Sequence, residues 1–325
     1  MIKTKVRQND FFDNIISIFE TPEVPLFMVV AAIFIFLSLV TDHFFAIFNI
    51  INIFKQASII GIIAIGATIV IISGGIDLSV GAIAGFSSMI LALILKNFDI
   101  PIWVAIGLAI LSGTLIGLYN GIVIYETRIP SFIATLGSMI IIQGITKLIS
   151  DAKMISGLPS KFTNFAYSSF LGMSLLVYVW VILSLMSYFI LYYTRFGRNI
   201  YTIGSSEEVA KLSGINLRLN IYFIYTLSGL CCSIAGVLLT ARLACAVPTG
   251  GQGYNLTAIA AAVIGGASLS GAQGSVLGTV LGTMLMVLIT NGGIHLGLSP
   301  FVMEITAGML ITIAVVMDKI RTKKD

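Results

Sequence analysis

Asp77 is the one acidic residue in the run Ser73–Gly81 (SGGIDLSVG), which follows a long apolar stretch and precedes another. A carboxylate among so many apolar residues is costly to bury, and such residues are usually functional or paired. Gly74 and Gly75 allow the backbone to bend before it, and Ser79 can cap a helix that follows. Two interpretations stay open: a site on a path for a polar solute, or a tight turn in which Asp77 caps the next helix.

The longest hydrophilic segment, residues 193–220, predicts a short amphipathic helix. Ser206 or the serine before it can cap this helix, and Glu207 and Glu208 would stand in its first turn, where carboxylates suit the positive end of the helix dipole. Gly214 is placed to end it. Its apolar side would consist of Val209, Ala210, Leu212 and Ile215. Either a partner protein grips this helix, or it is an ordinary loop helix that lies on a membrane.

Three further polar residues, Asn120, Gln143 and Asn291, stand inside apolar runs. Such side chains can hydrogen-bond to neighbouring helices or line a polar path, and the sequence does not separate these roles. Glu304 follows Pro300 at the start of the last apolar run and is expected to be interfacial.

Several kinds of chemistry have no motif in the sequence. No phosphate-binding loop, His–Glu zinc motif or G-x-S-x-G nucleophile elbow occurs. The three cysteines, Cys231, Cys232 and Cys245, have no metal-type spacing, and we interpret them as apolar packing residues. The basic residues are spread over short segments rather than one patch, which argues against nucleic acid as a partner. We therefore expect no catalytic residues, no metal and no cofactor bound by this chain.

The composition predicts what must position these residues. Hydrophobic residues make up 58% of the chain and charged residues only 10%, whereas a soluble domain carries roughly 25% charged residues. The apolar stretches are long and unbroken, as in helices that span a membrane, and do not alternate as in a β-barrel. The fold class is therefore an all-α integral membrane protein, a polytopic bundle of about ten transmembrane helices. The expected spans are 24–41, 54–73, 79–96, 101–124, 131–150, 171–193, 220–243, 254–270, 275–294 and 299–317, of which the eighth is the weakest and could be re-entrant.

Lysine and arginine in the short loops predict the orientation. With ten spans, twelve of these residues fall on the side of both termini and six on the other, which makes up the 18 in the chain and places both termini in the cytoplasm. The expected organisation is a cytoplasmic N-terminal segment (1–23), a transmembrane domain (24–318) with a cytoplasmic loop (194–219), and a cytoplasmic tail (319–325). The polar N-terminal segment does not resemble a secretory signal.

One short sequence pattern occurs twice in the chain, and we call it the internal echo. GGIDLS at 74–79 and GGASLS at 265–270 each follow an apolar run and precede another. Transporters often contain duplicated halves with broken helices. The echo predicts a parallel repeat, unless two glycine-rich joints are alike by chance.

Several motifs together resemble the permease subunits of ribose-type ABC sugar importers. They occur in the order and at the spacing of that family over roughly residues 25–318. The motifs are SGGIDLSVG at 73–81, PSFIATLGSMIIIQG at 130–144, TRFGR at 194–198, LSGI at 212–215, GYNLTAIAAAVIGGASLSGAQGSVLGTVLG at 253–282, and Asn291-Gly292.

The resemblance implies a type II ABC importer-like permease fold in the bacterial inner membrane, surrounded by lipid. It also implies three partners: an ATP-binding subunit that hydrolyses ATP, an extracytoplasmic sugar-binding protein, and a second permease copy or close paralogue. Coupling to the ATPase would involve Gly204, Glu207, Glu208, Ala210, Ser213 and Gly214. The candidates for the translocation path or its gate are Gly74, Gly75, Asp77, Ser79, Asn120, Gln143 and Asn291.

The sequence departs from the ribose permease pattern at three positions, which leaves the sugar open. Ala267 and Ala272 stand where threonine and glycine are expected, and Gln143 replaces a basic residue. Two other classes remain as alternatives. One is a secondary transporter driven by an ion gradient through Asp77 or Glu304, and the other is a membrane scaffold or sensor that transports nothing.

Overall fold

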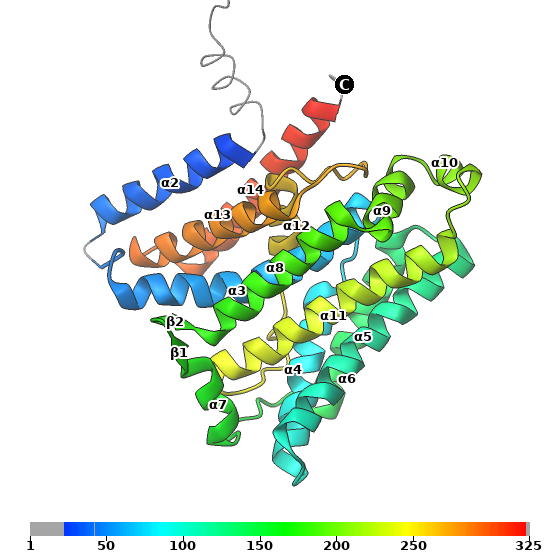
Figure 1. Cartoon of the computed structure of the whole chain (residues 1–325). Coiled ribbons are helices and arrows are strands. Elements are labelled where there is room, and N and C mark those ends of the chain that lie inside the picture. The colour runs from blue at the N-terminus through cyan, green and yellow to red at the C-terminus, as the bar shows by residue number, and fades with distance from the viewer. Residues whose placement is uncertain (1–22, 42, 323–325) are drawn as a thin grey trace, which may run out of the picture.

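The computed structural model describes residues 23–41 and 43–322, which form a bundle of helices with one small hairpin (Figure 1). The predicted segment 1–23 therefore lies almost wholly outside the described residues, as does the end of the predicted tail, 323–325. The elements are α2 (Glu23–Val40), α3 (Ile47–Ile72), α4 (Val80–Asn97), α5 (Ile102–Thr127), α6 (Ser131–Ile149), α7 (Ser160–Tyr167), β1 (Ser169–Phe170), β2 (Met173–Ser174), α8 (Leu175–Tyr193), α9 (Arg195–Ser205), α10 (Glu207–Leu212), α11 (Leu217–Leu243), α12 (Tyr254–Ile264), α13 (Val276–His295) and α14 (Pro300–Thr322).

The all-α polytopic class is confirmed, and each of the ten expected spans contains a helix. Eight of these helices are long and apolar enough to cross a membrane. The eighth expected span, 254–270, is wrong in its length, because α12 ends at Ile264. Eleven residues of α-helix reach about 16 Å, roughly half of the hydrocarbon thickness. Gly265 and Gly266 end the helix, and Gly266 has a φ of +94° that glycine adopts without strain.

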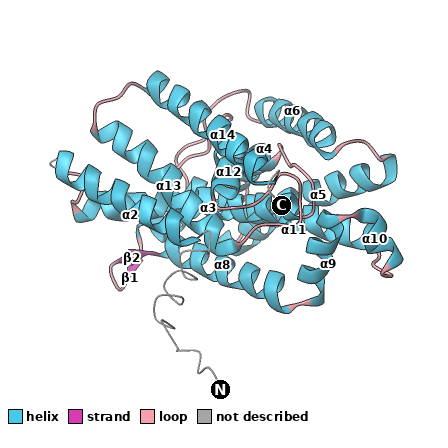
Figure 2. Cartoon of the chain, turned by 90° about the horizontal axis from the view of Figure 1, so that it is seen from above, coloured by secondary structure: helices cyan, strands magenta, loops and turns pink. Residues whose placement is uncertain are grey.

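The two ends of the bundle carry different elements (Figure 1). One end, here called the α10 face, holds α9, α10 and the loops 73–79 and 265–275. The opposite end, here called the hairpin face, holds α7 and the antiparallel pair β1–β2. The view from above places α6 at an edge of the bundle (Figure 2), where most of its apolar side chains are exposed.

Helices α3 and α11 occupy the centre of the bundle. Every residue of α3 from Ala57 to Ile72 is buried, and α11 buries a long stripe of small residues between Ser228 and Ala241. Lipid gives no hydrophobic driving force for helix association, so close contact between small residues must hold such helices together.

The contact between α5 and α11 shows this most clearly. Gly113, Gly117 and Gly121 recur every four residues on α5 and face α11. A Cβ on Gly117 would clash with the Tyr225 carbonyl and would lie 3.0 Å from the Gly229 Cα. The two backbones therefore touch, and any side chain at Gly117 would separate the helices.

Polar side chains also join helices inside the bundle. Asn49 on α3 and Asn291 on α13 are buried and exchange two amide hydrogen bonds, of 3.1 and 2.9 Å. The hydroxyls of Thr68 and Thr279 lie 2.7 Å apart and join the same two helices. These contacts place Asn291 at a helix–helix junction, which is one of the two roles that the sequence left open.

We expect Gly117→Leu to destabilise the protein by at least about 1–3 kcal/mol, the usual cost of overpacking a tight contact. Gly107→Leu on the same helix is the matched control, because a Cβ at Gly107 meets no atom within 4 Å. The apparent melting midpoint in detergent, read by size-exclusion fluorescence, should fall only for the first variant. Equal midpoints for the two variants would show that the backbone contact does not stabilise the fold.

Candidate translocation and coupling site

The Asp77 side chain lies in the loop between α3 and α4 and is only 1% exposed. Its Oδ1 accepts hydrogen bonds from the backbone N–H of Ser79 at 2.9 Å and from the Ser79 hydroxyl at 2.6 Å. Its Oδ2 accepts from the Ser228 hydroxyl of α11 at 3.0 Å. Asp77 thus both holds its own loop and joins it to a neighbouring helix, which agrees with the interpretation as a capped turn.

Ser79 does not cap α4 through its side chain, contrary to the prediction. It occupies the N-cap position, but its hydroxyl donates to Asp77 and accepts from the Asn120 amide of α5 at 2.9 Å. The Asn120 carbonyl in turn accepts from the Ser138 hydroxyl of α6. Three hydroxyls and one amide therefore link Asp77 to α5, α6 and α11. We call these five residues (Asp77, Ser79, Asn120, Ser138 and Ser228) the Asp77 cluster.

The backbone of the same loop is held by α6. The Ser131 hydroxyl accepts from the Ile76 N–H at 3.0 Å, and the Thr135 hydroxyl accepts from the Leu78 N–H at 3.1 Å. Buried N–H groups between two membrane helices need such partners, because hydrocarbon offers none. Neither Ser131 nor Thr135 was among the predicted site residues, and only their place in the motif 130–144 could have singled them out.

All donors to Asp77 are neutral. In the part of the chain that the structure describes, no lysine or arginine lies within ion-pair distance of it. The cluster therefore resembles a set of structural hydrogen bonds more than an ion-binding site, which would expose the carboxylate to an aqueous path.

The predicted amphipathic helix is α10. Ser206 caps it by accepting from the Val209 N–H at 3.3 Å, and Gly214 ends it with a φ of +77°. Ala210 is buried, whereas Leu212 is 85% exposed and Val209 is also exposed. An apolar side turned outward on a hydrophilic face is suited to a protein partner.

Gly204 lies at the junction between the predicted coupling segment and the predicted gate. A Cβ there would clash with the Ile72 carbonyl and would lie 2.7 Å from the Ala272 nitrogen. That nitrogen donates to the Ile72 carbonyl at 2.9 Å, so the end of α3 is bonded to the loop 265–275. A Cβ on Gly74 would lie 3.8 Å from the Gly204 Cα. Gly74 in the first echoing segment and Ala272, two residues after the second, thus both lie beside Gly204 at the α10 face.

The start of α10 also makes an ionic contact, with the residue that follows α5. The Arg128 guanidinium, just after α5, lies 3.7 Å from the Glu207 carboxylate at the start of α10. Arg128 also lies over the Tyr125 ring, 4.6 Å from its centroid. Arg128 has a left-handed φ of +58°, uncommon for a residue with a side chain. Sequence reasoning did not single out Arg128, whose partner is 79 positions away in the chain.

Besides the bond with Ile72 of α3, hydrogen bonds with α9, α2 and α14 hold the loop 265–275. The Tyr201 hydroxyl of α9 donates to the Gly274 carbonyl at 2.8 Å. Burial and the neighbouring Tyr192 raise the pKa of Tyr201 to about 12, so the hydroxyl keeps its proton at neutral pH. The Ser275 hydroxyl donates to Glu23 at 2.7 Å, and Asp318 accepts from the Leu269 N–H at 3.1 Å. Both α2 and α14, the first and the last described helices, therefore contact this loop.

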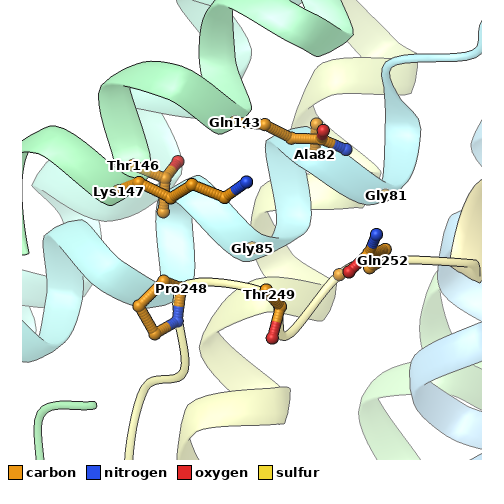
Figure 3. A pocket seen from close by; sticks show the side chains of 10 residues that line it. Gly81, Ala82, Gly85, Gln143, Thr146, Lys147, Pro248, Thr249 and Gln252 are labelled. Carbon is orange, nitrogen blue, oxygen red and sulfur yellow. The ribbon is translucent and has the colours of Figure 1, made fainter. Parts of the chain in front are cut away.

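Gln143 lines a small pocket between α6, α4 and the segment 248–252. Figure 3 shows the side chains of Gln143 and Lys147 extending from α6 into this space. The two residues are four apart, so they lie on one face of the helix. The volume is about 20 Å³, enough for one water molecule. We call this the α6 pocket, lined by Gly81, Ala82, Gly85, Gln143, Thr146, Lys147, Pro248, Thr249, Gly251 and Gln252.

The predicted gate residues therefore fall into separate places. Asp77, Ser79 and Asn120 belong to the Asp77 cluster, whereas Gln143 lies in the α6 pocket. Gly74 and Gly75 lie at the α10 face, where a Cβ on Gly75 would lie 2.5 Å from the Tyr225 hydroxyl.

These features define a class of protein. A bundle of membrane-spanning helices with interrupted segments, an internal polar cluster and an outward apolar helix at one face is a multi-pass membrane permease.

Comparisons with known proteins specify the family. Residues 49–316 match the family described as branched-chain amino acid transport system / permease component. The ribose import permease protein of Bacillus subtilis (strain 168) is 39% identical over 288 residues, which cover 88% of this chain and 89% of the relative. The D-allose transport system permease protein of Escherichia coli (strain K12) is 37% identical over 298 residues, 91% of each chain. The galactose/methyl galactoside import permease protein of the same strain is 36% identical over 304 residues, 86% of this chain and 88% of the relative.

The chain belongs to this family of transport-system permease components. The predicted family is confirmed, and so is the prediction of a permease rather than an enzyme. Membership implies an ABC importer in which the permease works with ATP-binding and substrate-binding partners.

We expect Asp77→Ala to lower the free energy of unfolding by about 1–3 kcal/mol or more, because it leaves buried hydroxyl and N–H donors unsatisfied. Asp77→Asn should cost much less, since its amide oxygen can accept from Ser79 and its amide group can donate to a rotated Ser228 hydroxyl. Unfolding of the purified variants, with Ser228→Ala and the double variant, gives the coupling between the two residues.

Ser112→Ala is the matched control, because its hydroxyl bonds only to the Ala109 carbonyl of its own helix. If Asp77→Asn proved as harmful as Asp77→Ala, the hydrogen bonds that an amide can also make would not account for the stabilisation by Asp77.

Proposed function

We propose that this chain is the membrane-spanning permease subunit of an ATP-driven ABC importer for a monosaccharide. The contact at Gly204 carries the proposal, since it joins α9, which leads directly into the outward helix α10, to both interrupted loops. A movement imposed on α9 and α10 by a partner would press directly on the Ile72 carbonyl and the loop 265–275. ATP would be hydrolysed by that partner.

The side chains that line the α6 pocket suit a sugar better than an amino acid. The family description names branched-chain amino acids, but the relatives above are import permeases for ribose, allose and galactose. Of the ten residues that line the pocket, Lys147 is the only charged one, and the polar remainder are amides and hydroxyls. A zwitterion would need a carboxylate for its ammonium group, whereas a sugar is recognised by neutral hydrogen-bonding groups.

Three partners are assigned to three surfaces. The ATP-binding subunit would dock on α10 through Leu212 and Val209. The α10 face and both termini would then be cytoplasmic. The extracytoplasmic sugar-binding protein would dock on the hairpin face. A second permease copy would cover the exposed side of α6 and close the α6 pocket into a path for the sugar.

The mechanism would be alternating access. Closure of the ATPase subunits moves α10 and α9, the contact at Gly204 transmits this to the ends of α3 and α12, and the Asp77 cluster carries it to α5 and α6. The α6 pocket, now large enough for one water, must widen for a sugar to pass.

Import is tested by reconstituting the chain in vesicles with an ATP-binding subunit and a sugar-binding protein from its genome. We expect uptake of radiolabelled D-ribose, D-allose or D-galactose only with ATP and the binding protein, and no effect of a protonophore. Uptake that survives removal of ATP but is lost with the protonophore would instead identify a secondary transporter. No uptake of any sugar, with uptake of leucine or valine, would overturn the substrate class.

Leu212→Asp should abolish capture of the ATP-binding subunit, because it places a charge on an apolar docking surface. Leu171→Asp on the hairpin face is the matched control, since both leucines are 85% exposed. Co-purification from membranes measures the effect, and the melting midpoints of the two variants should equal that of the unmodified protein. Undiminished capture by Leu212→Asp would remove α10 as the docking site.

A further inference from the structure

A second cavity opens at the α10 face, away from the α6 pocket. Its volume is about 320 Å³, within the roughly 300–1,000 Å³ of small-molecule sites. It lies among the loop after α3, the end of α5, the start of α6, and α9–α10. We call it the α10 pocket, lined by Ser73, Gly74, Gly75, Ile124, Tyr125, Arg128, Ile129, Pro130, Ser131, Ile203, Glu207, Ile221 and Tyr225.

The charges in this pocket restrict the ligand that it can hold. Arg128 and Glu207 are its only ionised residues, and they lie 3.7 Å apart with about half of each side chain exposed. An anion would be attracted by Arg128 but repelled by Glu207, whereas a cation would be attracted by Glu207 but repelled by Arg128. A neutral ligand with several hydroxyls avoids both penalties, because each hydroxyl donates to the carboxylate or accepts from the guanidinium.

The rest of the wall supports the same ligand class. The Ser73 hydroxyl donates to the Val70 carbonyl, so its lone pairs remain able to accept. Tyr125, Tyr225 and Ile129 supply apolar surface for the C–H groups of a small ring. The backbone at Arg128 is left-handed, and Pro130 restricts the backbone of Ile129 before it. Together they fix the direction of the chain between α5 and α6, which forms one wall of the pocket.

We propose that the α10 pocket binds a monosaccharide from the cytoplasmic side and that its occupation slows the transport cycle. The inference rests on the proposed function, since it takes the imported sugar as the ligand. A sugar between Arg128 and Glu207 would hold α10 against α5 and fill the space beside Gly74 and Gly75. It would stabilise the arrangement seen here, and a ligand that favours one state of a cycle opposes departure from it.

Coupling between sites is reciprocal, so movement of α10 by the ATPase must lower the affinity of the pocket. Accumulated product would thereby limit its own import. This site is separate from the α6 pocket, because the two pockets share no lining residue, and it borders the predicted gate at Gly74 and Gly75.

The test uses the reconstituted complex with the α10 face directed into the vesicle. Vesicles are loaded with unlabelled D-ribose, D-allose or D-galactose, whichever the complex transports, and the initial rate of ATP-driven uptake is measured. We expect a saturable fall of about fivefold or more, within the range of ordinary allosteric coupling. Inorganic phosphate in the lumen should not reproduce it, and equal inhibition by phosphate would show an anion site instead.

Ile129→Trp fills the pocket and should remove the inhibition by luminal sugar, so that its uptake rates into sugar-loaded and sugar-free vesicles become equal. Ile133→Trp is the matched control, because Ile133 is 50% exposed on α6 and does not line the pocket, whereas Ile129 is 38% exposed and does. Inhibition that persists in Ile129→Trp, or that is absent in the unmodified complex, overturns the proposal.

Calorimetry of the permease alone in lipid nanodiscs separates this inference from the proposed function. Binding of one of the three sugars that Ile129→Trp abolishes and Ile133→Trp retains would support the pocket even if the complex imported no sugar. Absence of binding by the unmodified permease would refute it, whatever the outcome of the transport assay.

Discussion

Backbone groups at the ends of interrupted helices must find partners inside the protein, because hydrocarbon supplies none. Helix α3 stops at Ile72, and the Ile72 carbonyl accepts from the Ala272 N–H in the loop after the half-length helix α12. In the loop 73–79, the N–H groups of Ile76 and Leu78 are satisfied by hydroxyls of α6. The same hydrogen bonds that make these breaks tolerable therefore also bind distant segments to one another.

That constraint explains why a glycine stands at position 204. The backbone of α9 at position 204 lies directly against the Ile72–Ala272 hydrogen bond, and no space remains there for a side chain. Contact between backbones has no rotamers through which a displacement could be absorbed. The ion pair between Arg128 and Glu207 is different, since it is exposed and such pairs contribute little rigidity. Force from α10 would therefore pass mainly through Gly204, while the Arg128–Glu207 gap is free to open and close.

Much of this architecture could be predicted from composition and local pattern. Apolar run length located the spanning helices, and Ser206 and Gly214 defined α10 because caps and left-handed stops are local signals. The predicted length of α12 was wrong. The stretch 254–270 is apolar enough over its whole length to predict a membrane span, although the helix ends before Gly265 and Gly266. The partners of Asp77 could not be predicted, since Ser228 is 151 residues away and its hydroxyl looks like any other in a span. The glycines of α5 carried a visible signal in their spacing of four, which indicates backbone contact in membrane helices.

The attachment of α6 is uneven along its length, and this bears on how a path could open. Its first two turns are fixed by the hydroxyls of Ser131, Thr135 and Ser138 to the loop 73–79 and α5. Beyond Ser138 only Ile142 and Thr146 are buried, while the α6 pocket lies beside this half. Hydrogen bonds hold one end and weaker apolar contact holds the other, so a displacement of the Asp77 cluster would tilt α6 about its attached end. The largest movement would then occur at Gln143 and Lys147, where the pocket must widen. In the proposed mechanism, the buried carboxylate of Asp77 would therefore act on the pocket through α6, without contact with the solute.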